Sequence, residues 1–164
     1  MIEAVAFDLD GTLVRLPIDY EMLCEEFKKI MQTAEVRPLV DAISKIDEET
    51  RKLVFTAWEK AELGVFKETS INEPGMKIYR DFVDKPKALV TLQGKAIVDA
   101  ILKKFGLIFN TVITREDELL RINQLKKVLV RLKVNANNLL FVGNTDGDAA
   151  TAKKIGCQFH RIPE

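Results

Sequence analysis

The stretch AVAFDLDGT at residues 4–12 ends an apolar run in two carboxylates. Residues 4–7 predict a buried strand. Because side chains alternate along a strand with period two, Asp8 and Asp10 begin on the same side. Like charges this close are unfavourable unless a positive group lies between them. Mg²⁺ is the simplest such group, since it takes one or two carboxylates together with a phosphate. The plain alternative is a strand end with an Asp-Gly turn and a Thr helix cap.

Composition limits the classes of function. The chain has 164 residues, with 25 Lys+Arg and 25 Asp+Glu, so bulk positive charge does not favour nucleic-acid binding. No apolar run reaches the roughly 18 residues of a membrane span, and the N-terminus has no basic region typical of a secretion signal. Cys24 and Cys157 show no motif spacing, which fits a reduced compartment. We therefore expect a cytoplasmic protein, either a monomer or a homodimer.

Strand and helix patterns alternate through the second half of the chain. Apolar runs predict strands at 88–92, 111–113, 139–142 and 158–162, and amphipathic spacing predicts helices at 95–105, 122–133 and 147–155. Such alternation predicts an α/β fold with a doubly wound, Rossmann-like parallel sheet covered on both faces. Sheets of this kind bind ligands at the carboxyl ends of their strands.

A helical block interrupts this alternation after the first strand. Residues 19–31, 37–46 and 47–64 predict three helices, and the third carries an apolar stripe of Leu53, Ala57 and Ala61. We interpret residues 15–73 as a small all-helical cap inserted into a core formed by residues 1–14 and 74–164. Arg15 follows the first motif and could reach an anionic substrate, as could Arg37 and Arg51 within the insertion.

Polar residues follow four of the predicted strands. After Asp8, Asp10 and Thr12 come Thr91 with the segment LQGK at 92–95, then TRED at 114–117 leading to Arg121, and finally GNTDGD at 143–148. A hydroxyl, a cation and a second acidic cluster therefore face the first acid pair. Phosphoryl transfer requires such a set, because its catalysis depends on positioning and on stabilising charge at the phosphoryl oxygens.

The segments FDLDGT at 7–12, ALVTLQGKA at 88–96 and FVGNTDGD at 141–148 resemble three motifs of the haloacid dehalogenase superfamily in order and spacing. The resemblance covers essentially the whole chain, with the helical block as the family's cap. It implies Mg²⁺, an aspartyl-phosphate mechanism and a small phosphorylated metabolite as substrate. The subgroup of phosphoglycolate phosphatases is the nearest analogy within the family. An acid at position 10 favours phosphate chemistry over carbon–halogen cleavage.

The resemblance also implies residue roles. Asp8 would be the nucleophile, and Asp10 would act as general acid and base while binding the metal through its carbonyl. Thr91 and the amide of Leu92 would hold a phosphoryl oxygen. Further substrate contacts and turn geometry would come from Gly11, Thr12 and Arg15. The predicted metal ligands are Asp8, Asp10, Asn144 and Asp148.

Two positions depart from the family pattern. The usual lysine of the third motif is best matched by Arg121, whose guanidinium binds phosphate well, with Lys126 and Lys127 as rivals. The fourth motif usually begins with a metal-binding Asp, where this chain has Asn144. An amide oxygen brings no charge, so weaker Mg²⁺ binding is expected. One alternative is therefore a weak or inactive member that binds a phosphorylated ligand or a protein. A response-regulator receiver is disfavoured by the long insertion and the DxDGT arrangement.

Overall fold

The structure is a computed structural model that describes residues 1–163. Within that range the main sheet has five parallel strands in the order β5-β4-β1-β6-β7. The strands are β1 (Ala4–Phe7), β4 (Lys87–Val90), β5 (Thr111–Ile113), β6 (Leu139–Gly143) and β7 (Gln158–Arg161). The predicted α/β class with a parallel sheet is confirmed.

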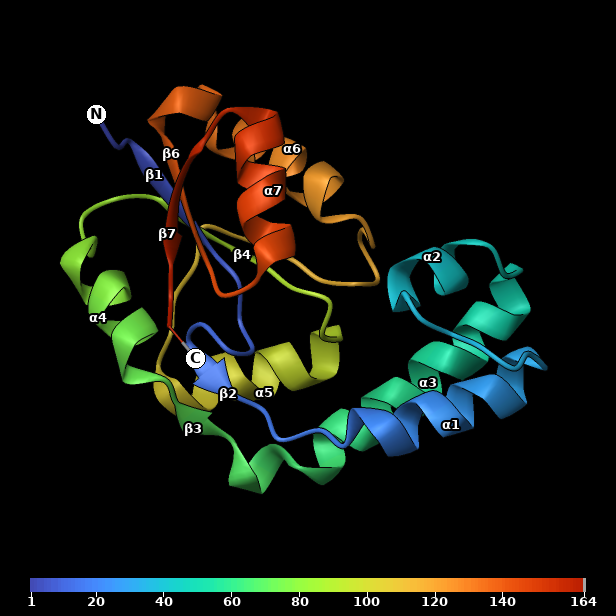
Figure 1. Ribbon diagram of the computed structural model, residues 1–164. Helices are drawn as coiled ribbons and strands as arrows, with labels where there is room; N and C mark the ends of the chain where they lie inside the picture. The colour runs from blue at the N-terminus through green and yellow to red at the C-terminus, as the bar shows by residue number, and fades with distance from the viewer. Residues whose placement is uncertain (164) are drawn as a thin grey trace.

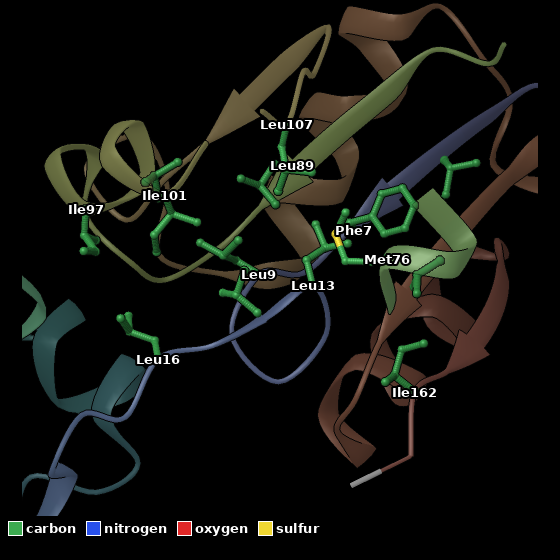
Figure 2. Close-up of a cluster of buried hydrophobic side chains, with 14 residues drawn as sticks. Phe7, Leu9, Leu13, Leu16, Met76, Leu89, Ile97, Ile101, Leu107 and Ile162 are labelled. Carbon is green, nitrogen blue, oxygen red and sulfur yellow. The ribbon is translucent and has the colours of Figure 1, made fainter. Parts of the chain in front are cut away.

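Alternation along β1 divides the core into two layers. Val5 and Phe7 join an apolar cluster with α4 (Glu73–Asp81) and α5 (Lys95–Phe105), part of which Figure 2 shows around Phe7 and Leu9. Ala4 and Ala6 point to the opposite face, where α6 (Arg121–Leu132) and α7 (Asp146–Ile155) pack. The helices therefore cover both faces of the sheet (Figure 1). Complete burial of both β1 faces explains its continuous apolar sequence.

The helical insertion follows β1, as predicted, and forms its own apolar cluster beside the sheet (Figure 1). It contains α1 (Tyr20–Met31), α2 (Leu39–Ser44) and α3 (Glu48–Gly64). Asp19 caps α1 by accepting from the amide of Met22, and Asp47 caps α3 by accepting from the amide of Thr50. Trp58 and Phe27 meet edge-on at 5.7 Å within this cluster. Capping acids and an aromatic pair thus fix the insertion locally.

An antiparallel ribbon joins the insertion to the sheet and was not predicted from the sequence. It pairs β2 (Val14–Arg15) with β3 (Ser70–Ile71), where we expected a connector and a linker. Short 3₁₀ turns, η1 (Phe66–Glu68) and η2 (Ala136–Asn138), complete the chain. Strands of two residues carry too few side chains to show a periodic signal.

The predicted stripe of α3 is wrong at Leu53, whereas Ala57 is buried as predicted and Ala61 packs against the apolar cluster of the insertion. Leu53 is 60% exposed, whereas Val54, Ala57 and Trp58 are buried. The helix predicted over residues 37–46 is shorter in the structure, where α2 spans Leu39–Ser44 with Pro38 as its N-cap residue. The buried face of α3 therefore includes Val54, Ala57 and Trp58 and leaves Leu53 in solvent.

The sheet order positions the functional segments. Because β4, β1 and β6 are neighbours, the loops that follow their carboxyl ends meet at one edge of the sheet. Arg121 begins α6, whose buried face packs on the same sheet. Among residues 1–163, no helix combines the length and apolar character needed to cross a membrane.

Candidate active site

A cavity of about 340 Å³ opens where these loops meet the insertion. Six residues singled out from the sequence line it, and five further residues come from the insertion and nearby loops. The first group is Asp8, Asp10, Thr91, Leu92, Arg121 and Asn144, and the second is Tyr20, Leu39, Trp58, Gln93 and Thr145. The cavity therefore gathers segments that lie more than 130 residues apart in the sequence.

The end of β1 places both acids on the cavity wall. The amide of Asp8 donates to the carbonyl of Val142 on β6 at 3.0 Å, which continues the sheet by one residue. Leu9 points instead into the apolar core (Figure 2), so Asp8 and Asp10 share one side as period two requires. The Asp10 carboxylate accepts from the amide of Leu16 at 2.9 Å, which holds the turn after the strand.

Gly11 is required by its backbone conformation and by its neighbour. Its φ of +81° lies in the left-handed region, and a Cβ there would come within 2.2 Å of the side-chain nitrogen of Asn144. Thr12 is buried and donates from Oγ1 to Asn144 Oδ1 at 3.5 Å. The turn after β1 is therefore fitted against the side chain that follows β6. Gly11 and Thr12 shape the site without lining the cavity.

Arg121 joins two acids from different loops. Its Nη2 donates to Asp8 Oδ1 at 3.0 Å and its Nε donates to Asp148 Oδ1 at 3.2 Å, while Nη1 donates to Gln124 Oε1 at 2.7 Å. Of the rival cations, Lys127 reaches the carbonyl of Asp117 and Lys126 is exposed. Arg121 is therefore the cation that the structure brings to Asp8.

Burial makes both acids weaker than free carboxylic acids. Desolvation raises the pKa of Asp8 to about 7; the Arg121 guanidinium lowers it, and the nearby Asp148 raises it further. Desolvation also raises the pKa of Asp10, although the amides of Leu16 and Gly11 oppose the shift. Two acids with raised pKa values in one cavity are typical of proton-transfer and nucleophilic sites.

Thr91 fixes the loop after β4. Its hydroxyl accepts from the amide of Gln93 at 3.0 Å, and its carbonyl accepts from Gln124 Nε2 at 2.9 Å. The loop is therefore anchored from within and from α6, with Thr91, Leu92 and Gln93 facing the cavity.

Asn144 and Asp148 occupy different positions relative to the cavity. Asn144 lines it, whereas Asp148 is buried behind it and accepts from Arg121 and from the amide of Asn144 at 3.3 Å. Asp148 is not among the lining residues. Within residues 1–163, no group of three or more His, Cys, Asp or Glu side chains is arranged to hold a metal ion. A hard cation here would depend on Asp8, the Asn144 amide oxygen and backbone carbonyls, and such oxygen donors suit Mg²⁺.

Arg15 lies away from the cavity. Its guanidinium donates to Asn72 Oδ1 at 3.3 Å, and Asn72 in turn donates to the carbonyl of Thr12 at 3.0 Å. Its observed contacts therefore support the turn and the ribbon.

A buried ion pair joins the insertion to the sheet beside this site, and sequence reasoning missed it. Arg115 donates from Nη1 and Nη2 to the two carboxylate oxygens of Glu62 at 2.7 and 2.9 Å, and both side chains are fully buried. Glu62 also accepts from the amide of Gly94 at 3.1 Å. One sequence feature could have indicated that Glu62 is buried. It lies four residues after Trp58, and residues with this spacing share one face of a helix.

Tyr20 and Gln93 form a second polar contact that the sequence did not suggest. Gln93 Nε2 donates to the Tyr20 hydroxyl at 3.2 Å. Burial raises the pKa of the Tyr20 hydroxyl to about 12, so the phenol is neutral at pH 7. The contact links α1 of the insertion to the loop after β4.

The fold and the acid pair define an α/β protein with a helical insertion over the carboxyl edge of its sheet. The sequence model of the family described as haloacid dehalogenase-like hydrolase matches residues 83–162. Residues 83–162 are therefore similar in sequence to the haloacid dehalogenase-like hydrolases, and this match covers just under half of the chain. No curated protein matches the chain.

Solved structures support the fold over almost the whole chain. A proposed phosphoglycolate phosphatase from Lactobacillus plantarum is 18% identical with a TM-score of 0.71, covering 97% of this chain and 86% of that one. CbbY from Rhodobacter sphaeroides, in complex with phosphate, is 15% identical with a TM-score of 0.68, covering 100% and 87%. A haloacid dehalogenase-like protein from Streptococcus pneumoniae is 16% identical with a TM-score of 0.71, covering 98% and 84%. At these identities the likeness concerns the fold alone.

Proposed function

We propose that this chain is a Mg²⁺-dependent phosphatase that hydrolyses a small phosphomonoester through an aspartyl phosphate on Asp8. The observation that carries the proposal is the convergence of Asp8, Asp10 and Arg121 on one cavity at the carboxyl edge of the sheet. The match of residues 83–162 to the haloacid dehalogenase-like hydrolases supports it, as does the phosphate bound by the structurally similar CbbY. The proposed L. plantarum phosphatase favours the same class of reaction.

In the first step, a carboxylate oxygen of Asp8 attacks phosphorus in line with the ester oxygen. The new O–P bond forms as the bond from phosphorus to the leaving oxygen breaks. The Asp10 carboxylic acid gives its proton to that oxygen, which departs as an alcohol. Burial raises the pKa of Asp10, and this favours the protonated form that the step requires.

In the second step, Asp10 acts as a base. Its carboxylate takes a proton from water as the water oxygen attacks phosphorus, and the Asp8–phosphorus bond breaks. Inorganic phosphate and the Asp8 carboxylate are the products. Asp10 is again a carboxylic acid, so the cycle closes with no other reactant.

Neighbouring groups bind the charges of the phosphoryl group. Arg121 holds Asp8 in place, and the Thr91 hydroxyl and the Leu92 amide lie on the cavity wall to receive phosphoryl oxygens. Asp8, the Asp10 carbonyl and Asn144 would hold Mg²⁺, with Asp148 fixing Arg121 and the Asn144 amide behind them. The cation would neutralise the phosphoryl oxygens and favour ionised Asp8.

Phosphate release from an aryl phosphate, measured with and without Mg²⁺, tests the proposal. We expect Mg²⁺-dependent release that falls on the order of 10³-fold or more in Asp8→Asn. Asp146→Asn is the matched control, because that acid is almost fully exposed and lies outside the cavity. Unchanged release by Asp8→Asn would refute the nucleophile.

One observation favours a second candidate, a phosphate-binding protein without turnover. Asn144 offers no charge, and residues 1–163 contain no acidic cluster arranged for a metal. Under this alternative, calorimetry would detect inorganic phosphate binding at the cavity, while no phosphorylated compound would release phosphate with Mg²⁺ present.

A further inference from the structure

The wall of the cavity supplied by the insertion and by Gln93 is uncharged. Tyr20, Leu39 and Trp58 come from α1, α2 and α3 of the insertion, and Gln93 comes from the loop after β4. Two aromatic rings, an aliphatic side chain and an amide therefore face the space beyond the phosphoryl group. The leaving alcohol of a phosphomonoester bound at Asp8 would occupy this space.

No spare cation faces that wall. Arg121 is the only lining cation among the described residues, and each of its three guanidinium nitrogens already donates to Asp8, Asp148 or Gln124. The arginines that the sequence suggested for an anionic substrate lie elsewhere. Arg15 donates to Asn72, and Arg51 donates to the carbonyl of Ile43. Arg37 borders a separate hollow together with Glu35.

The polar groups of the wall suit a hydroxyl better than a carboxylate. Gln93 uses its Nε2 on the Tyr20 oxygen, which leaves the Tyr20 O–H as a donor. Gln93 Oε1, an acceptor, and Trp58 Nε1, a donor, are both buried and have no hydrogen-bond partner within residues 1–163. A hydroxyl group both donates and accepts, so it can satisfy both positions after a small shift of the amide. A carboxylate brings acceptors only and would lie near the acids Asp8 and Asp10.

From this wall we propose that the leaving group is an uncharged alcohol that carries a further hydroxyl group and an apolar face. An alcohol that carries a carboxylate, such as glycolate, would not fit. The inference rests on the proposed function and narrows its substrate class. A second anionic group in this cavity would lose its hydration with no counter-ion to replace it. The phosphoglycolate analogy drawn from the family is thereby set aside for this chain.

Two substrates that differ in one group test the inference. In 2-hydroxyethyl phosphate, a CH₂OH group stands where phosphoglycolate has its carboxylate. We expect kcat/KM for 2-hydroxyethyl phosphate to exceed that for phosphoglycolate by about tenfold or more. Equal values, or a preference for phosphoglycolate, would overturn the inference.

A binding measurement separates this inference from the proposed function. Calorimetry with Asp8→Asn and each compound needs no turnover, and tighter binding of 2-hydroxyethyl phosphate is expected. If neither compound releases phosphate but that binding preference holds, the proposed phosphatase activity fails, while the preference of the cavity for an uncharged hydroxyl group over a carboxylate stands. Equal affinities, tighter phosphoglycolate binding, or no binding of either compound would overturn the inference.

A charge added to the wall provides the converse test. Leu39→Lys places a cation among the lining residues, so phosphoglycolate should gain about tenfold relative to 2-hydroxyethyl phosphate. Leu63→Lys is the matched control on α3, because Leu63 is 46% exposed and lies outside the cavity. The same gain in both variants, or none in Leu39→Lys, would contradict the placement of the leaving group.

Discussion

Two arginines six residues apart hold acids in different ways. Arg115 meets Glu62 in a bidentate pair with both side chains at 0% exposure. Arg121 lies between Asp8 and Asp148 and keeps 19% of its side chain exposed at the cavity. The first pair is closed to solvent and ligand, whereas the second faces the space where a substrate would bind. An arginine–carboxylate ion pair therefore attaches the insertion to the sheet at Arg115 and forms part of the candidate active site at Arg121.

The surroundings of Arg115 explain its role as an attachment. Its guanidinium lies 4.5 Å from the Trp58 ring and also donates to the carbonyl of Leu92 at 3.2 Å. Glu62 accepts from the amide of Gly94 on the same loop. The pair thus joins α3 of the insertion to the loop after β4, which carries Thr91. Through this contact the insertion helps to position the loop that faces the cavity.

The largest expected effect on stability comes from breaking the buried ion pair between Arg115 and Glu62. Arg115→Met should lower the free energy of unfolding by about 3–5 kcal/mol, because Glu62 would remain buried without a counter-ion and with only the Gly94 amide as a donor. Urea unfolding measures the change, and the exposed Arg131→Met should alter it by less than about 0.5 kcal/mol. Adding Glu62→Leu to Arg115→Met should recover much of the loss. A loss under about 1 kcal/mol in Arg115→Met would show that the pair does not hold the insertion.

Replacing Arg121, at the cavity, should affect activity more than stability. Arg121→Met should lower kcat/KM for phosphate release about 100-fold, since Asp8 loses its partner and the phosphoryl group loses a nearby cation. Its cost in stability should be smaller than that of Arg115→Met. The reason is that Asp8 borders the cavity, where water can approach its carboxyl group, whereas Glu62 is fully buried away from the cavity. An equal loss of stability in both variants would erase the distinction.

The fold followed from residues whose signal is local. The buried run before Asp8, the Asp caps of α1 and α3, and the glycine after α5 each act on neighbouring residues, so the sequence predicted these elements well. Asp8, Asp10, Arg121 and Asn144 line one cavity, because parallel strands bring their carboxyl ends to one edge of the sheet.

The contacts that the sequence did not reveal depend on distant partners. Glu62 and Arg115 lie 53 residues apart, and neither side chain indicates alone that the other neutralises it in the core. Leu53 was predicted to be buried because an apolar residue on an exposed helix face cannot be told from a core residue by its spacing alone. Tyr20 and Gln93 reach the cavity only after the insertion packs against the sheet. These contacts therefore depend on tertiary packing, which the local sequence pattern does not indicate.

Measuring thermal stability across a pH series isolates the contribution of the buried Asp8 carboxyl group. The folded-state pKa of Asp8 is about 7, against 3.8 in the unfolded chain, so the native state keeps a proton that the unfolded state releases. Its contribution to stability is therefore complete below about pH 4 and declines as pH rises to about 7. Relative to the unmodified chain, the Tm of Asp8→Asn without Mg²⁺ should rise across this window and level off above it. A pH-independent difference in Tm would contradict the raised pKa.

Asn144→Asp should produce the smallest effect, and it concerns the site alone. The added carboxylate would strengthen a hard-cation site formed with Asp8, so the Mg²⁺ concentration that gives half-maximal phosphate release should fall about tenfold. Mg²⁺ should also raise the Tm of this variant more than that of the unmodified chain, since a ligand that binds only the folded state stabilises it. The exposed Asn137→Asp adds the same charge outside the cavity and should change neither quantity. Unaltered Mg²⁺ affinity in Asn144→Asp would place that side chain away from the cation, leaving Arg121 as the main positive group beside Asp8.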